Sequence, residues 1–96
     1  MKKSYDAILV EKENIKGLKF PEENIYSSSR ELREIDIKLR IASILGNMEK
    51  IKCKIFFEDS EAVKVVETTI WATCEKNIEL KAGIHIPIRR IIDIVI

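Results

Sequence analysis

The fold is decided by residues 48–96, which read MEKIKCKIFFEDSEAVKVVETTIWATCEKNIELKAGIHIPIRRIIDIVI. Short runs with a period of two follow one another here, separated only by brief turns, and this pattern is typical of half-buried antiparallel strands. We predict five strands, at residues 50–57, 63–73, 78–80, 84–86 and 91–96. Strands joined this tightly indicate a small, strongly curved β-barrel.

The second of these runs is long for a strand, and its alternation slips at Val65-Val66. A slip of this kind marks a bulge or bend where a strand turns a barrel corner. The residues then expected on the inner face are Val66, Thr68, Ile70 and Ala72, and those on the outer face are Glu67, Thr69, Trp71 and Thr73. Pro87 cannot donate to a neighbouring strand, so we expect it at a strand end, leading a tight turn over residues 87–90.

A helix is predicted ahead of the barrel, over residues 28–46. Ser28-Ser29-Arg30-Glu31 has the S-x-x-E pattern of a capping box, and Gly46-Asn47 supplies a C-terminal stop. The apolar residues with helical spacing are Leu32, Ile35, Leu39 and Ala42, flanked by Ile37, Ile41 and Leu45.

Residues 35–41 also alternate perfectly, as a half-buried strand would. We favour the helix because Glu34–Lys38 and Asp36–Arg40 are well-oriented pairs at a spacing of four residues. The capping box and the glycine stop also bracket the segment correctly.

Residues 1–27 are predicted to form an N-terminal arm that lies on the core, with a short strand at residues 5–10. Gly17 and Pro21 mark an irregular connection after it. With 96 residues, the arm, the helix and the barrel make a single domain, residues 1–96, of the α+β class.

Charge and composition exclude several classes of function. Seventeen basic and sixteen acidic residues give a net charge of +1, so no global field attracts nucleic acid or an anionic membrane. No apolar run has the length of a signal peptide or a membrane span. These observations predict a cytoplasmic protein with no membrane partner.

Reactive side chains are few and scattered. Cys53 and Cys74 fall in strand-like runs, and we interpret both as small hydrophobes rather than as a disulfide or as zinc ligands. His85 is expected on the outer face, with no nucleophile or carboxylate near it in the sequence. We therefore predict that the protein is not an enzyme and has no cofactor, no metal and no evident small-molecule substrate.

Two segments carry a resemblance to known proteins. The stretch from Glu67-Thr68-Thr69-Ile70-Trp71-Ala72 through Ile86-Pro87-Ile88-Arg89-Arg90-Ile91, with Leu45-Gly46-Asn47 ahead of it, resembles a group of short uncharacterised bacterial proteins. The strand pattern resembles SH3-like and Sm-like small barrels at the level of the fold. The acidic loops and paired aromatic residues of a peptide-binding SH3 domain are missing, as is the glycine-rich Sm signature, so the resemblance implies no ligand.

The sequence offers one candidate nucleic-acid surface. Lys50, Lys52 and Lys54 share a strand face, and a small barrel could bring Arg89 and Arg90 close to it. A lysine row also protects an edge strand from aggregation, which is the plainer interpretation. Base stacking would require exposed aromatic side chains, for which the candidates are Trp71, Tyr5 and Tyr26.

Trp71 is the candidate anchor for a protein partner. It lies on the face opposite Ile70, where the helix or the arm could cover it or leave it exposed. Because the charges balance, we favour a non-enzymatic adaptor that binds another protein or a second copy of itself, with RNA or single-stranded DNA as the alternative.

Overall fold

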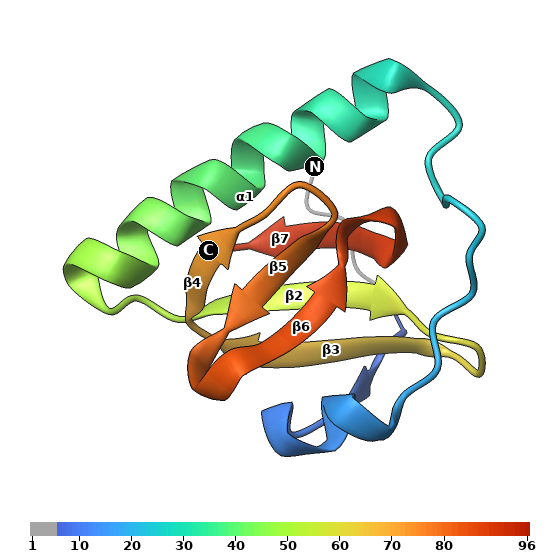
Figure 1. Ribbon diagram of the computed structural model, residues 1–96, viewed down its shortest axis with the longest axis horizontal. Helices are drawn as coiled ribbons and strands as arrows, with labels where there is room; N and C mark the ends of the chain where they lie inside the picture. Colours follow the sequence, from blue (N-terminus) through green and yellow to red (C-terminus); the bar gives the residue numbers. More distant parts are fainter. Residues whose placement is uncertain (1–5) are drawn as a thin grey trace.

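The chain folds as one long helix and two β-sheets, the α+β class that the sequence predicts (Figure 1). The computed structural model describes residues 6–96. In chain order the elements are β1 (Ile8–Leu9), η1 (Lys12–Gly17), α1 (Ser29–Glu49), β2 (Cys53–Glu58), β3 (Val63–Thr68), β4 (Ile70–Thr73), β5 (Asn77–Leu80), η2 (Lys81–Gly83), β6 (Ile84–Pro87), η3 (Ile88–Arg90) and β7 (Ile91–Val95).

The first sheet has the strand order β1-β3-β2-β7, and the second has the order β4-β5-β6. Neighbouring strands are antiparallel, except that β1 runs parallel to β3 along the sheet edge. The strand predicted over residues 63–73 is divided at Thr69 into β3 and β4, which belong to different sheets. The described strands therefore do not close into a barrel, and the prediction of a closed barrel is wrong.

The break at Thr69 replaces the bend expected at Val65-Val66. β3 alternates without a slip, because the side chain of Lys64 points inward like that of Val66. Lys64 can occupy an inner position because its ammonium group lies 2.5 Å from the buried carboxylate of Asp59. The slip predicted at Val65-Val66 is therefore wrong, since Lys64, Val66 and Thr68 are buried in regular alternation.

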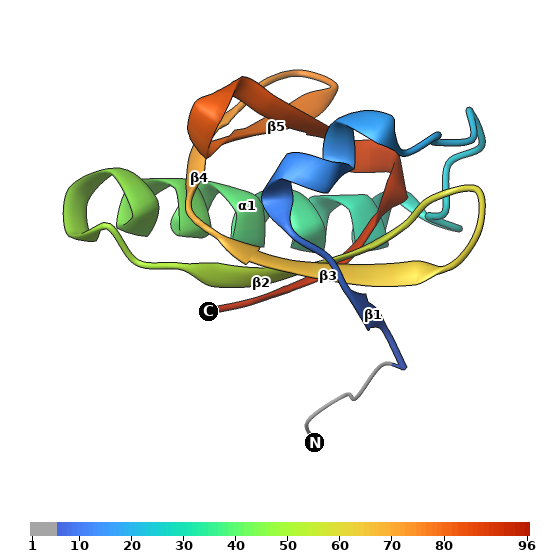
Figure 2. The ribbon, with the colours of Figure 1, turned by 90° about the horizontal axis from the view of Figure 1, so that it is seen from below.

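The core lies between the two sheets and is covered on opposite sides by α1 and η1. α1 packs against β4 and β7, whereas η1 packs against β6 and β3 (Figures 1 and 2). The inner faces follow the predicted register: Ile55, Ile70 and Ile86 are fully buried, while Lys54 and His85 are exposed.

α1 begins where the capping box predicts. The Oγ of Ser28 accepts a hydrogen bond from the amide of Glu31 at 3.3 Å. The carboxylate of Glu31 accepts from the amide of Ser27 at 3.1 Å, one residue further upstream than in the usual box. α1 then runs unbroken, with Asp36 and Arg40 paired at 3.0 Å, so the alternative of a strand in this segment is excluded.

The sequence predicted that the helix stops at Gly46, but it does not. It continues to Glu49, and Lys50 ends it in the left-handed region at a φ of 58°. Gly46 is buried against β4, where a Cβ would lie 2.5 Å from the carbonyl oxygen of Ile70 and 2.8 Å from the Cγ2 of Thr69. The glycine therefore allows helix and strand to approach closely and does not terminate the helix.

The part of the N-terminal arm that the structure describes, residues 6–27, packs along the core, as predicted. Ile15 of η1 is buried, and the ring of Phe20 packs on Phe57 with 5.9 Å between ring centroids. The strand predicted at residues 5–10 is observed as β1, Ile8–Leu9, and Tyr5 lies outside the described residues.

Candidate binding surfaces

The predicted lysine row is not one strand face. Lys50 is the left-handed cap of α1, Lys52 lies in the connection that follows, and only Lys54 belongs to β2. Lys50 leaves the predicted strand because α1 extends past Gly46. All three lysines are exposed.

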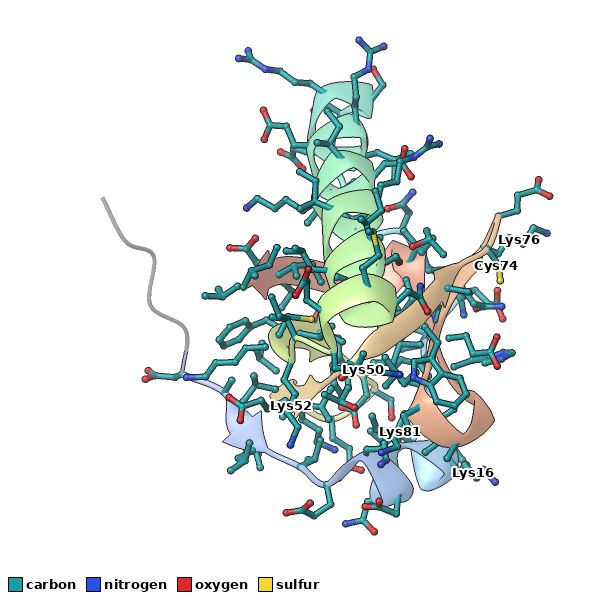
Figure 3. All side chains as sticks on the ribbon, turned by 90° about the vertical axis from the view of Figure 1, so that its left-hand side faces the viewer. Lys16, Lys50, Lys52, Cys74, Lys76 and Lys81 are labelled. Carbon is teal, nitrogen blue, oxygen red and sulfur yellow. The ribbon has the colours of Figure 1, made fainter. Side chains whose placement is uncertain are left out.

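A lysine distant in sequence joins this group. Lys81, the first residue of η2, lines the same groove as Lys52, and Figure 3 shows it near Lys50 and Lys52 below the C-terminal end of α1. None of these three exposed lysines forms an ion pair with another residue in the part of the chain that the structure describes. We call Lys50, Lys52 and Lys81 the basic patch. Lys76 lies well away from it in Figure 3.

A groove of about 610 Å³ adjoins the basic patch, between the arm and the outer faces of β2 and β3. Its charged lining residues are Lys12, Lys52, Lys54, Lys81, Glu11, Glu13 and Glu67. Lys54 and Glu67 are direct partners across the β2–β3 ladder. Because three glutamates offset the four lysines, the groove provides little net field for an anion.

Trp71 stays partly exposed, at 45%, on the face opposite the buried Ile70. Its backbone carbonyl accepts a hydrogen bond of 2.8 Å from the side-chain amide of Asn47, which ties β4 to the last turns of α1. Ile70 pairs with Leu80 in the β4–β5 ladder, and Lys81 follows that pair directly. Trp71 therefore belongs to the same end of the molecule as the basic patch.

Arg89 and Arg90 do not join the lysines. The guanidinium of Arg90 is buried and donates to the carbonyl oxygen of Glu58 at 3.0 Å and to that of Glu23 at 2.9 Å. Arg89 is half-buried and donates to the carbonyl oxygen of Pro21 at 2.9 Å. Glu58 ends β2, whereas the lysines lie at its start. Both arginines hold the arm against the core and are withdrawn from the surface predicted for them.

Tyr26 is also a structural residue rather than a stacking platform. Its hydroxyl donates to the carbonyl oxygens of Ile88, at 3.0 Å, and Ile91. Burial, reinforced by the negative charges of Asp93 and Glu31, raises the pKa of Tyr26 far above its ordinary value. The ring is half-buried and packs against the hydrophobic core.

The largest feature that the sequence analysis missed is a second apolar face on α1. Ile37 and Ile41 were predicted to flank the buried face of α1, but they lie on the opposite face. The exposed fractions are 52% for Ile37, 48% for Ile41, 57% for Ile44 and 75% for Met48. These positions stand two residues from the buried Ile35, Leu39, Ala42 and Gly46, and two residues correspond to about 200° on a helix.

We call Ile37, Ile41, Ile44 and Met48 the exposed seam. Their spacing of four, three and four residues is the pattern with which one helix packs along another. A helix that is apolar on two opposite faces is ordinarily covered on both. The four-three-four spacing is visible in the sequence, but the prediction placed Ile37 and Ile41 together with the buried residues on one broad apolar face.

Comparison with models of known protein families, with curated proteins and with solved structures found no match for this chain. The surfaces above must therefore be interpreted from their own chemistry.

The reactive side chains named in the sequence analysis are Cys53, Cys74 and His85. Burial raises the pKa of the Cys53 thiol to about 11, which keeps it protonated and unreactive at neutral pH. His85 is exposed, and Cys74 is exposed and free. Between residues 6 and 96, His, Cys, Asp and Glu side chains do not gather in threes as a metal site would require. No helix within the same residues is long and apolar enough to span a bilayer.

Proposed function

We propose that this protein is a non-enzymatic binding module that acts through contact with other protein surfaces. The observation that carries the proposal is the exposed seam of α1, an apolar stripe on the helix face that points away from the core. Contiguous apolar patches on a folded surface ordinarily mark interaction sites.

The size of the apolar contribution favours this function over one driven by charge. Burying one large aliphatic side chain is worth about 1.5–3 kcal/mol, so four half-exposed side chains offer roughly 3–6 kcal/mol. Because the net charge is only +1 and glutamates line the groove, the electrostatic free energy available for binding a polyanion is much smaller. Trp71 adds an aromatic anchor at one end of the same helix.

We also infer that β2 to β7 are the strands of an opened SH3-like or Sm-like small barrel. β2 pairs with both β3 and β7, so the first and last of these strands are neighbours. β3 and β4 form a long run interrupted at Thr69, and η3 is a single tight turn after Pro87. A long bent strand and a proline-led turn are the features on which the resemblance rests.

The seam is tested by capture from an extract of the native cell. Immobilised protein is expected to retain specific proteins, this chain itself included, and Ile44→Glu is expected to reduce their recovery at least tenfold. Ile96→Glu is the matched control, because Ile96 is exposed to the same extent, 56% against 57%, but lies off the helix. Equal recovery by the two variants, or no specific recovery by the unaltered protein, would contradict the proposal.

A second candidate function is the binding of single-stranded nucleic acid. The observation in its favour is that the exposed Trp71 belongs to the same end of the molecule as Lys50, Lys52 and Lys81. Lysines that contact phosphates beside an aromatic ring that stacks on a base are the usual elements of such a site.

This candidate predicts a mobility shift of single-stranded RNA or DNA that weakens steeply with salt. Lys52→Glu combined with Lys81→Glu should abolish the shift, whereas Lys76→Glu, an exposed lysine away from the patch, should leave it largely intact. Trp71→Ala should weaken binding without changing the salt dependence, because stacking releases no counterions. No shift at micromolar protein, or equal loss with Lys76→Glu, would eliminate this function.

A further inference from the structure

The exposed seam has the geometry of a helix-pairing surface. It spans residues 37 to 48, which is about 17 Å of helix at 1.5 Å per residue. Its four side chains lie on one line because spacings of four and three residues return to the same face. The partner that fits such a line is another helix with the same spacing, and a second copy of α1 supplies one.

The residues beside the seam decide how two copies can pair. Helical periodicity sets Glu31, Lys38 and Leu45 along one side of it and Arg33, Arg40 and Asn47 along the other. In a parallel pair, the Glu31–Lys38–Leu45 side of one helix faces the Arg33–Arg40–Asn47 side of the other. Arg33 of each copy would then lie opposite Lys38 of the other copy. Two such contacts between like charges are unfavourable.

An antiparallel pair avoids this conflict, because each side of one helix faces the same side of the other helix. Lys38 then meets Leu45 of the second copy, and Arg40 meets Asn47. Arg40 is paired within its own helix with Asp36 at 3.0 Å, and Lys38 is paired with Asp93 of β7 at 2.7 Å. Both pairs are present in either arrangement, so the two arrangements differ in the contact between Arg33 and Lys38. The charges of the helix therefore select the antiparallel arrangement.

We propose that two copies of this protein associate through α1, antiparallel, about a two-fold axis that passes between Ile41 and Ile44. This inference rests on the proposed function and names the partner of the seam. The axis sets Ile37 against Met48 of the second copy and Ile41 against Ile44 of the second copy. The contact is isologous and closed, so it gives a dimer and no larger assembly.

The area of the seam is sufficient for such a dimer. The four side chains form an apolar strip on the order of 400 Å² per copy, within the range of a functional patch. Counted on both copies the strip amounts to roughly 800 Å², and the flanking polar side chains bring the contact towards the roughly 1,000 Å² expected of a specific interface. Because area alone does not set affinity, the mass in solution is measured over a range of protein concentrations.

The first experiment measures the mass of the intact protein in solution by sedimentation equilibrium. The unaltered protein and Ile96→Glu are expected to associate to twice the chain mass of 11.1 kDa. Ile41→Glu combined with Ile44→Glu is expected to give a monomer with an unchanged circular dichroism spectrum, because both residues are about half exposed. A dimer that survives this double substitution would place the interface elsewhere and overturn the inference.

The second experiment determines the direction of the helices with a short bismaleimide cross-linker. Ile37→Cys and Met48→Cys are prepared separately in a Cys74→Ser background, since Cys74 is exposed and Cys53 is buried. In the antiparallel dimer the two variants cross-link efficiently only when they are mixed. Efficient cross-linking of each variant with itself would show a parallel pair and overturn the proposed arrangement.

The two experiments separate this inference from the function on which it rests. A monomer at all concentrations, together with loss of captured proteins in Ile44→Glu, would overturn the dimer and leave a protein-binding seam. A monomer whose captured proteins do not depend on Ile44 would overturn both.

Discussion

Asp59→Asn is expected to destabilise the fold by about 3–5 kcal/mol, a large part of the stability of a domain of this size. Asp59 and Lys64 are both buried, at 3% and 8% exposed, and their charged groups lie 2.5 Å apart. Asp59 also accepts hydrogen bonds from the amides of Glu61 and Ala62 at 2.9 Å, so it organises the β2–β3 turn. Asparagine keeps the shape but leaves a buried ammonium group without a counter-charge. Denaturation in urea measures the loss.

A second substitution serves as the control. Adding Lys64→Met to Asp59→Asn removes the unpaired charge and should recover at least about 1–2 kcal/mol of the free energy of unfolding. If Asp59→Asn alone cost less than about 1 kcal/mol, the pair would have to be solvated, as exposed ion pairs are.

The same pair governs stability in acid. Burial acts to raise the pKa of Asp59, but the hydrogen bonds from Lys64 and from the backbone amides outweigh it and hold the pKa below its ordinary value of 3.8. The carboxylate therefore contributes its full stability above that pH and loses it as the pH falls through the lowered pKa. Asp59→Asn should flatten this part of the stability profile.

Ile70→Ala is expected to cost about 2–5 kcal/mol, because it leaves a cavity at a fully buried position at the start of β4. Trp71→Ala is the matched control, one residue away on the opposite face, and at 45% exposure it should lose about 1 kcal/mol or less. Thermal or urea unfolding of the two variants provides the comparison. Equal losses would mean that the tryptophan belongs to the core and cannot serve as an anchor.

Which side chains of each strand point into the core could be predicted from the sequence, because this depends on the local alternation of apolar and polar residues. Ile55, Ile70 and Ile86 point inward and His85 points outward, as a period of two requires. The start of α1 was equally predictable, since Ser28 and its capping bond are local.

Features that depend on distant partners were not predictable. Gly46 looked like a helix stop because its actual neighbours, Thr69 and Ile70, lie more than twenty residues away. The inward position of Lys64 could not be predicted because a sequence pattern cannot show that Asp59 will be buried beside it. Arg90 looked like a surface residue because its acceptors, the carbonyls of Glu23 and Glu58, become neighbours only in the folded chain.

The bonds of the arm also set an order of events during synthesis. The amide of Ile25 donates to the carbonyl oxygen of Arg89 at 3.1 Å, and the hydroxyl of Tyr26 donates to carbonyl oxygens of η3 and β7. The arm leaves the ribosome before its polar partners, which lie more than sixty residues further along the chain. Residues 20–26 must therefore stay solvated until η3 and β7 have emerged, so this segment reaches its final contacts only after the strands that follow it have been made.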